Sequence, residues 1–201
     1  TVYRIAFKYS TGLAATSTSI DFYNGLVDAE GDAEIVSDWR VIASTSSIDA
    51  IVNTGTTATD GLAASGDVPI YNTLGEKIWD GNTEMWDGAT TVQGAVIFTL
   101  AGGHPGGAGV DYQRVWTGSF TDGTGQSGNE LGNSTVTRGI NFVAGHLNGT
   151  QWIDIGEAPN TSLYSIYGLS GVIGSAIPEP SSMSLLAIGG LGVLLMRRLR
   201  G

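Results

Sequence analysis

Residues 114–125 read RVWTGSFTDGTG, and this stretch carries the clearest structural pattern in the chain. A short β-type run that contains Val115 and Trp116 is followed by Gly118 and then by an Asp-Gly-Thr sequence at residues 122–124. Valine and tryptophan favour strands, whereas Asp-Gly pairs favour tight turns. The stretch therefore predicts a short strand that ends in a turn.

Similar short runs occupy the second half of the chain. Glycine, asparagine, aspartate and serine separate them, as expected for a sheet with long irregular loops. The other runs are VPIYN at 68–72, AVIFTL at 95–100, QWIDIG at 151–156 and SLYSIYGLSGVI at 162–173. Between the first two, Ile78, Met85 and Trp86 are predicted to form the apolar side of a short helix.

The first third of the chain has a helical pattern instead. In residues 19–30, Ser19 is a suitable N-cap, and apolar residues recur near the helical period of 3.6 at Ile20, Tyr23, Leu26 and Val27. A second short helix is expected at 46–53, after a strand at 38–45. An order of helices first and strands with loops afterwards predicts an α+β domain.

Four of these stretches together resemble the endostatin-like branch of the C-type lectin-like fold. They are residues 10–22 (STGLAATSTSIDF), 68–88, 114–125 and 162–172, so the resemblance covers most of residues 10–173. It implies a C-type lectin-like (endostatin-like) α+β domain in which the last strand returns to the core. Related domains carry cysteines where this chain has Asn129, Leu131 and Ser165, so packing must replace a disulfide here.

The composition limits the partners of the body. The chain has 201 residues, a net charge of -10 and no cysteine. Six basic and eighteen acidic residues precede Ile177, which gives the body a charge of −12. Phosphate backbones repel such a surface, so nucleic acid is excluded as a partner. The acidic surface favours cations and basic surfaces, or it only keeps an exported protein soluble.

The C-terminal segment differs from everything before it. Residues 181–196 contain no charge, and these sixteen residues are followed by Arg197, Arg198 and Arg200. As a helix the run would span about 24 Å, and flanking serines and arginines extend its reach. Its apolar residues point to all sides of a helix rather than along one stripe. We therefore expect a single transmembrane helix through the inner membrane, with the basic end in the cytoplasm and the body outside.

Just before this run, Pro178, Glu179 and Pro180 form a tripeptide that the two prolines hold extended. The prolines, the apolar run and the basic end occur in this order at the terminus, and the segment resembles the PEP-CTERM sorting signal of Gram-negative bacteria. The resemblance implies recognition by an exosortase, which cuts near the tripeptide. It divides the chain into an extracellular domain, residues 1–176, and a sorting signal, residues 177–201. The body would then be at the cell surface or secreted.

No residue pattern indicates catalysis or a metal site. The two histidines, His104 and His146, lie in glycine-rich surroundings, and a zinc site would require them to meet a carboxylate such as Asp111. The chain lacks a G-x-S-x-G sequence and a phosphate-binding loop. We therefore expect no catalytic residue, no bound metal and no cofactor.

Calcium-dependent sugar binding is also disfavoured. Lectins of that kind use Glu-Pro-Asn followed later by Trp-Asn-Asp, whereas this chain has WID at 152–154 before EAPN at 157–160. Loops around Asp122 and Asp154 remain candidates for weak cation binding. The tryptophans are expected to be buried rather than exposed for sugar stacking, and they are Trp39, Trp79, Trp86, Trp116 and Trp152.

The sequence thus predicts a non-enzymatic exported protein that is processed by an exosortase. The body is expected to associate with exopolysaccharide or biofilm matrix, or to serve adhesion. The alternative is a carbohydrate- or protein-recognition module that uses the loops between its strands. An enzyme with an unrecognised site is the least favoured function.

Overall fold

The computed structural model describes residues 2–57, 67–87, 97, 99–101, 114–140 and 151–174. The predicted sorting tripeptide, the predicted transmembrane run and the basic end all lie outside these residues. Among the described residues, no helix has both the length and the apolar character needed to cross a bilayer.

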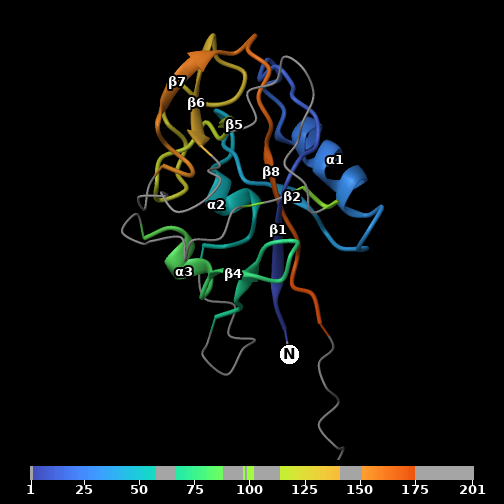
Figure 1. The fold of residues 1–201 in the computed structure, drawn as a ribbon. Coiled ribbons are helices and arrows are strands. Elements are labelled where there is room, and N and C mark those ends of the chain that lie inside the picture. Colours follow the sequence, from blue (N-terminus) through green and yellow to red (C-terminus); the bar gives the residue numbers. More distant parts are fainter. Residues whose placement is uncertain are drawn as a thin grey trace, which may run out of the picture.

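A five-stranded sheet forms the centre of the body (Figure 1). Its order is β2-β8-β1-β3-β4, and β1 runs antiparallel to β8 and parallel to β3. The last strand therefore lies between two strands from the first quarter of the chain. The strands are β1 Arg4–Lys8, β2 Arg40–Val41, β3 Ile70–Tyr71, β4 Lys77–Trp79 and β8 Tyr167–Leu169.

A second, three-stranded antiparallel sheet has the order β5-β6-β7. Its strands are β5 Arg114–Trp116, β6 Thr135–Ile140 and β7 Gly156–Pro159. A single parallel bridge between Val115 and Ser165 connects this sheet to the chain that leads into β8. Next to the end of β6, Gly139 lies against the backbone of Trp152, and a Cβ added there would be 1.8 Å from the Trp152 carbonyl oxygen.

In the described residues, three helices accompany the sheets: α1 Ile20–Gly31, α2 Ala50–Asn53 and α3 Asn82–Met85. The predicted helix near residues 19–30 is confirmed, with Ser19 at its N-cap position and Tyr23 and Val27 buried. Asn24 of α1 and Asn53 of α2 exchange side-chain hydrogen bonds of 2.9 and 3.0 Å. Asn24 also accepts a hydrogen bond from the Val41 N–H at 2.9 Å, which fixes both helices to β2.

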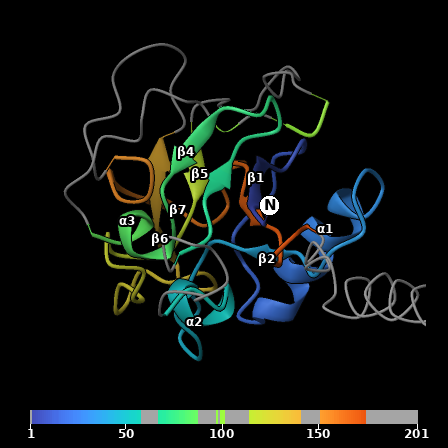
Figure 2. The same ribbon diagram turned by 90° about the horizontal axis from the view of Figure 1, so that it is seen from below.

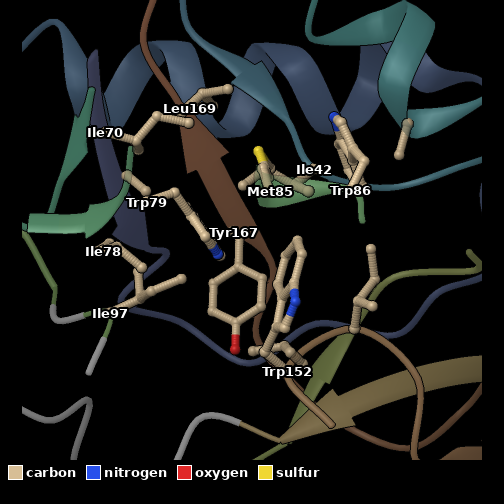
Figure 3. Packing of buried hydrophobic residues seen from close by; sticks show 14 residues of the cluster. Ile42, Ile70, Ile78, Trp79, Met85, Trp86, Ile97, Trp152, Tyr167 and Leu169 are labelled. Carbon is tan, nitrogen blue, oxygen red and sulfur yellow. The ribbon is translucent and has the colours of Figure 1, made fainter. Parts of the chain in front are cut away.

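Two clusters of buried side chains form the core. One contains Trp79, Trp86, Trp152 and Tyr167, whose rings lie close together in Figure 3. The other lies beside α1 and includes the Phe7 and Trp39 rings, whose centroids are 5.0 Å apart. The prediction that the tryptophans are buried is confirmed, because none of the five is more than 7% exposed.

The fold is α+β, as predicted, but several elements differ from the expectation. Strand β1 precedes the first helix, so the order of helices first was wrong. Residues 151–153 form a turn and β7 begins only at Gly156. Trp152 and Ile153 are both buried in this turn. Ile78 belongs to β4 rather than to the short helix.

The run AVIFTL was also expected to form a strand. Its described positions, Ile97 and residues 99–100, lie outside any strand. Ile97 nevertheless packs in the core cluster of Trp152 and Tyr167, so its burial agrees with the apolar character of the run.

Candidate functional site

A solvent-open groove of about 670 Å³ lies between the segment before β3, strand β4 and helix α3. Its size is within the range of small-ligand sites. Figure 2 shows β4 and α3 on the side of the body away from α1. The lining residues are Asp67, Pro69, Tyr71, Lys77, Asp80, Gly81, Thr83, Glu84 and Asp87, and we call this feature the β4–α3 groove.

Asp67 fixes the start of α3 at one wall of the groove. The residue at the N-cap position is Gly81, which has no side chain to accept a hydrogen bond. Asp67 supplies the acceptor from a different segment, since its Oδ2 accepts from the Thr83 N–H at 3.1 Å. An added Cβ on Gly81 would lie 2.2 Å from the Asp67 Cγ. Glycine at this position therefore allows the carboxylate to reach the helix.

The lining of the groove also includes an ion pair between Lys77 and Asp80. The hydrogen bond to Asp80 raises the pKa of Lys77, so the ammonium stays protonated. The Asp80 backbone N–H donates to the Glu84 carboxylate, which places a second carboxylate beside the first. With Asp67 and Asp87, the wall residues include four carboxylates and one ammonium. The groove therefore favours ligands that donate hydrogen bonds or carry positive charge.

Tyr71 connects the groove to the two ends of the described body. Its ring meets the Tyr3 ring edge-on, with centroids 6.2 Å apart. Tyr3 in turn pairs with Ile173, through hydrogen bonds of 2.9 Å from the Tyr3 N–H and 2.8 Å from the Ile173 N–H. The groove is thus close to the point where the chain leaves the body towards its C-terminus. In Figure 1 the N-terminal end and the end of the last strand lie at the same end of the molecule.

The candidate metal residues His104, Asp111 and His146 lie outside the described residues. Within the part of the chain that the structure describes, no group of three or more His, Cys, Asp or Glu side chains is arranged to hold a metal ion. The Asp122 carboxylate accepts hydrogen bonds from the N–H and the hydroxyl of Thr124, at 3.0 and 2.6 Å. Asp122 therefore stabilises the predicted Asp-Gly-Thr turn.

Asp154 and Glu157, the acidic residues of the WID and EAPN sequences, are both hydrogen-bonded within the body. Glu157 accepts a hydrogen bond from the Asn129 side chain at 2.9 Å. Burial raises the pKa of Asp154, and the Gly156 N–H offsets part of this rise.

Leu131 and Ser165, the residues compared above with cysteine positions, have packing and hydrogen-bond contacts. Leu131 is 1% exposed and belongs to the second core cluster. The buried Ser165 hydroxyl donates to the Tyr9 carbonyl at 2.5 Å.

Sequence reasoning did not find the β4–α3 groove. The available signal was the density of acidic residues around the run at 78–88, with Asp80, Glu84 and Asp87 in it and Asp67 and Glu76 before it. The pattern did not indicate that Asp67 lies beside the start of α3. The two segments meet because strands β3 and β4 pair with each other.

Residues 176–200 match the family described as the PEP-CTERM protein-sorting motif. A search of curated proteins found no match to the chain. The matched range contains Pro178, Glu179, Pro180 and the three C-terminal arginines, whose individual roles stay predictions. The predicted sorting motif is confirmed: the protein is exported to the cell surface or exterior, passes through a membrane-anchored precursor and is processed by an exosortase.

Proposed function

We propose that the body is a non-enzymatic, cofactor-free domain that associates with the exopolysaccharide or biofilm matrix outside a Gram-negative cell, or serves adhesion there. The observation that carries this proposal is the sorting motif at residues 176–200, which directs an acidic body to the exterior. In this proposal residues 1–176 are the extracellular domain, residues 181–196 hold the precursor in the inner membrane, and an exosortase is the processing partner.

We also propose that the body has the endostatin-like variant of the C-type lectin-like fold. Three features of the structure support this. Helix α1 follows the Gly-Leu-Ala sequence at residues 12–14, and β5 runs into the Asp-Gly-Thr turn. The last strand, β8, returns to the core between β1 and β2.

The sorting step is tested by changing Pro178, Glu179 and Pro180 to alanine together. Alanines remove the fixed extended backbone, so full-length protein should accumulate in the cell envelope, as measured by immunoblots of envelope and medium. The matched control changes Ser181 and Ser182 to alanine, which leaves the prolines and all charges in place. Unchanged release of the triple variant would contradict the role of the tripeptide.

The matrix step is tested with purified residues 1–176 in a pull-down against polysaccharide from the producing cells. Retention by the polysaccharide is expected. If the body binds neither this polysaccharide nor cell-surface material, the matrix and adhesion proposals both fail, while the sorting step is unaffected.

The β4–α3 groove favours a second candidate function, recognition of a carbohydrate or protein ligand. Carboxylates accept hydrogen bonds from sugar hydroxyls, and the Tyr71 ring offers an apolar face. Changing Asp80 and Asp87 to asparagine should weaken binding in a glycan array about tenfold. A hydrogen bond to a charged acceptor contributes about 1 kcal/mol more than one to a neutral acceptor, and about 1.4 kcal/mol corresponds to tenfold in affinity. Asp21→Asn with Glu34→Gln removes equal charge elsewhere and should bind normally. Equal binding by all three proteins would exclude the groove.

A further inference from the structure

The last hydrogen-bonded contact of the described body is the antiparallel bridge between Tyr3 and Ile173. It lies beyond the paired ends of β1 and β8, where Ala6 is opposite Leu169. Both of its residues are partly buried. We call this pair the terminal bridge, and it is the contact nearest to the sorting motif along the chain.

Only four residues, 174–177, separate the terminal bridge from Pro178. Fully extended, four residues reach at most about 14 Å. The active site of the processing enzyme must therefore act very close to the folded body.

Enzymes that bind an extended chain pair with its backbone N–H and C=O groups. In the closed terminal bridge, both of these groups of Ile173 are bonded to Tyr3. Ile173 is then unavailable for pairing with the enzyme.

Opening the terminal bridge leaves the rest of the sheet intact. The next fixed positions are Ser170 and Gly171. The Ser170 N–H donates to the Ile5 carbonyl and its hydroxyl accepts from the Ile5 N–H, both at 2.9 Å, and the Gly171 N–H donates to the Asp38 carbonyl at 2.8 Å. The number of residues between the last fixed position and Pro178 then grows from four to six, residues 172–177. Local openings of this kind at the end of a sheet occur without global unfolding.

We propose that the terminal bridge opens before the exosortase cuts, so that pairing between Tyr3 and Ile173 limits the rate of processing. This inference rests on the processing of the chain at its sorting motif. Tyr3 is a positioning residue in this step. It does not contact the reacting atoms, and it acts only by setting how many residues before Pro178 the enzyme can reach.

The test locks the bridge in the full-length chain. Tyr3→Cys with Ile173→Cys introduces the only cysteines of the protein, so a single disulfide can form. Residues in a hydrogen-bonded antiparallel pair have Cα atoms about 5.5 Å apart, which suits a disulfide. A pulse-chase experiment in cells that contain the exosortase measures processing as the loss of the C-terminal segment over time. The oxidised variant should be processed about tenfold more slowly than Tyr3→Ser with Ile173→Ser, and a reductant should restore the rate.

A second pair of variants separates spacing from other effects of the disulfide. Five residues, Gly-Ser-Gly-Ser-Gly, are inserted after Gly174 in the locked and the unlocked chain. Both should be processed at the same rate, because the insertion supplies the free segment without opening the bridge.

Equal rates for the locked and unlocked chains at native spacing would overturn the proposal. An equal slowing by the disulfide with and without the insertion would overturn it as well. If the unaltered chain is not processed at all, the sorting step itself fails, which is a different result from a bridge that has no influence.

Discussion

The Tyr167 ring belongs to the aromatic core cluster (Figure 3), and its hydroxyl has no hydrogen-bond partner within the described part of the chain. The residue is fully buried, and its ring centroid is 6.2 Å from that of Trp152. Burial raises the pKa of Tyr167, so the hydroxyl stays neutral. An unpaired buried hydroxyl lowers stability by about 1–3 kcal/mol relative to a satisfied one.

Tyr167→Phe should therefore stabilise the body. The missing oxygen leaves a void of roughly 15 Å³, which costs about 0.4 kcal/mol. Removal of the unpaired hydroxyl gains free energy at the lower end of the range of about 1–3 kcal/mol, and the void costs about 0.4 kcal/mol. The free energy of unfolding should therefore rise by about 1 kcal/mol.

The matched control is Tyr23→Phe. The Tyr23 hydroxyl donates to the Ser17 carbonyl and accepts from the Ser17 N–H, both at 3.0 Å. Its loss should lower the free energy of unfolding by about 1–2 kcal/mol. Burial also raises the pKa of Tyr23 to about 12, so both hydroxyls are neutral in the assay at pH 7.

Urea unfolding of residues 1–176, followed by tryptophan fluorescence, measures both variants. The midpoint should rise for Tyr167→Phe and fall for Tyr23→Phe, with the same dependence on urea. A fall for Tyr167→Phe as large as that for Tyr23→Phe would refute the reasoning, because it would require a satisfied hydroxyl at Tyr167.

Two further variants address the backbone and the pH dependence. Gly139→Ala places a Cβ against the Trp152 carbonyl and should lower the free energy of unfolding by about 3 kcal/mol or more. The same urea assay measures this change. Near-normal stability would show that β6 can move away from the turn. The pKa of Asp154 is raised in the folded state, so its contribution to stability is present below the unfolded pKa and is lost as pH rises through the folded pKa. Asp154→Asn should consequently raise the melting temperature at pH 7 and leave it unchanged at pH 3, and a lower melting temperature at pH 7 would contradict this sign.

Local patterns in the sequence predicted some elements well. The period of 3.6 after Ser19 predicted α1, and the run around Val115 and Trp116 predicted β5 with its turn. In both cases the signal lies within about a dozen consecutive residues. The sorting motif can be recognised from the sequence for the same reason, because its parts follow one another along the chain.

Features that depend on distant segments were missed. The start of the chain was not assigned to a strand, although β1 is fully paired, because its partners Tyr167–Leu169 lie far away in sequence. The turn at Trp152 follows from its packing against Gly139, which no local pattern reports. The β4–α3 groove required Asp67 to meet the start of α3 through the pairing of β3 with β4.

The central place of β8 has a consequence for biosynthesis. Strands β1 and β2 are made first, but β2 has no neighbour in the sheet, and β1 has only β3, until Tyr167–Leu169 have been synthesised. The nascent body therefore stays incomplete until its last dozen residues have emerged from the ribosome. A prematurely terminated chain would expose two unpaired strand edges, which makes it a substrate for chaperones and proteases rather than a smaller functional body.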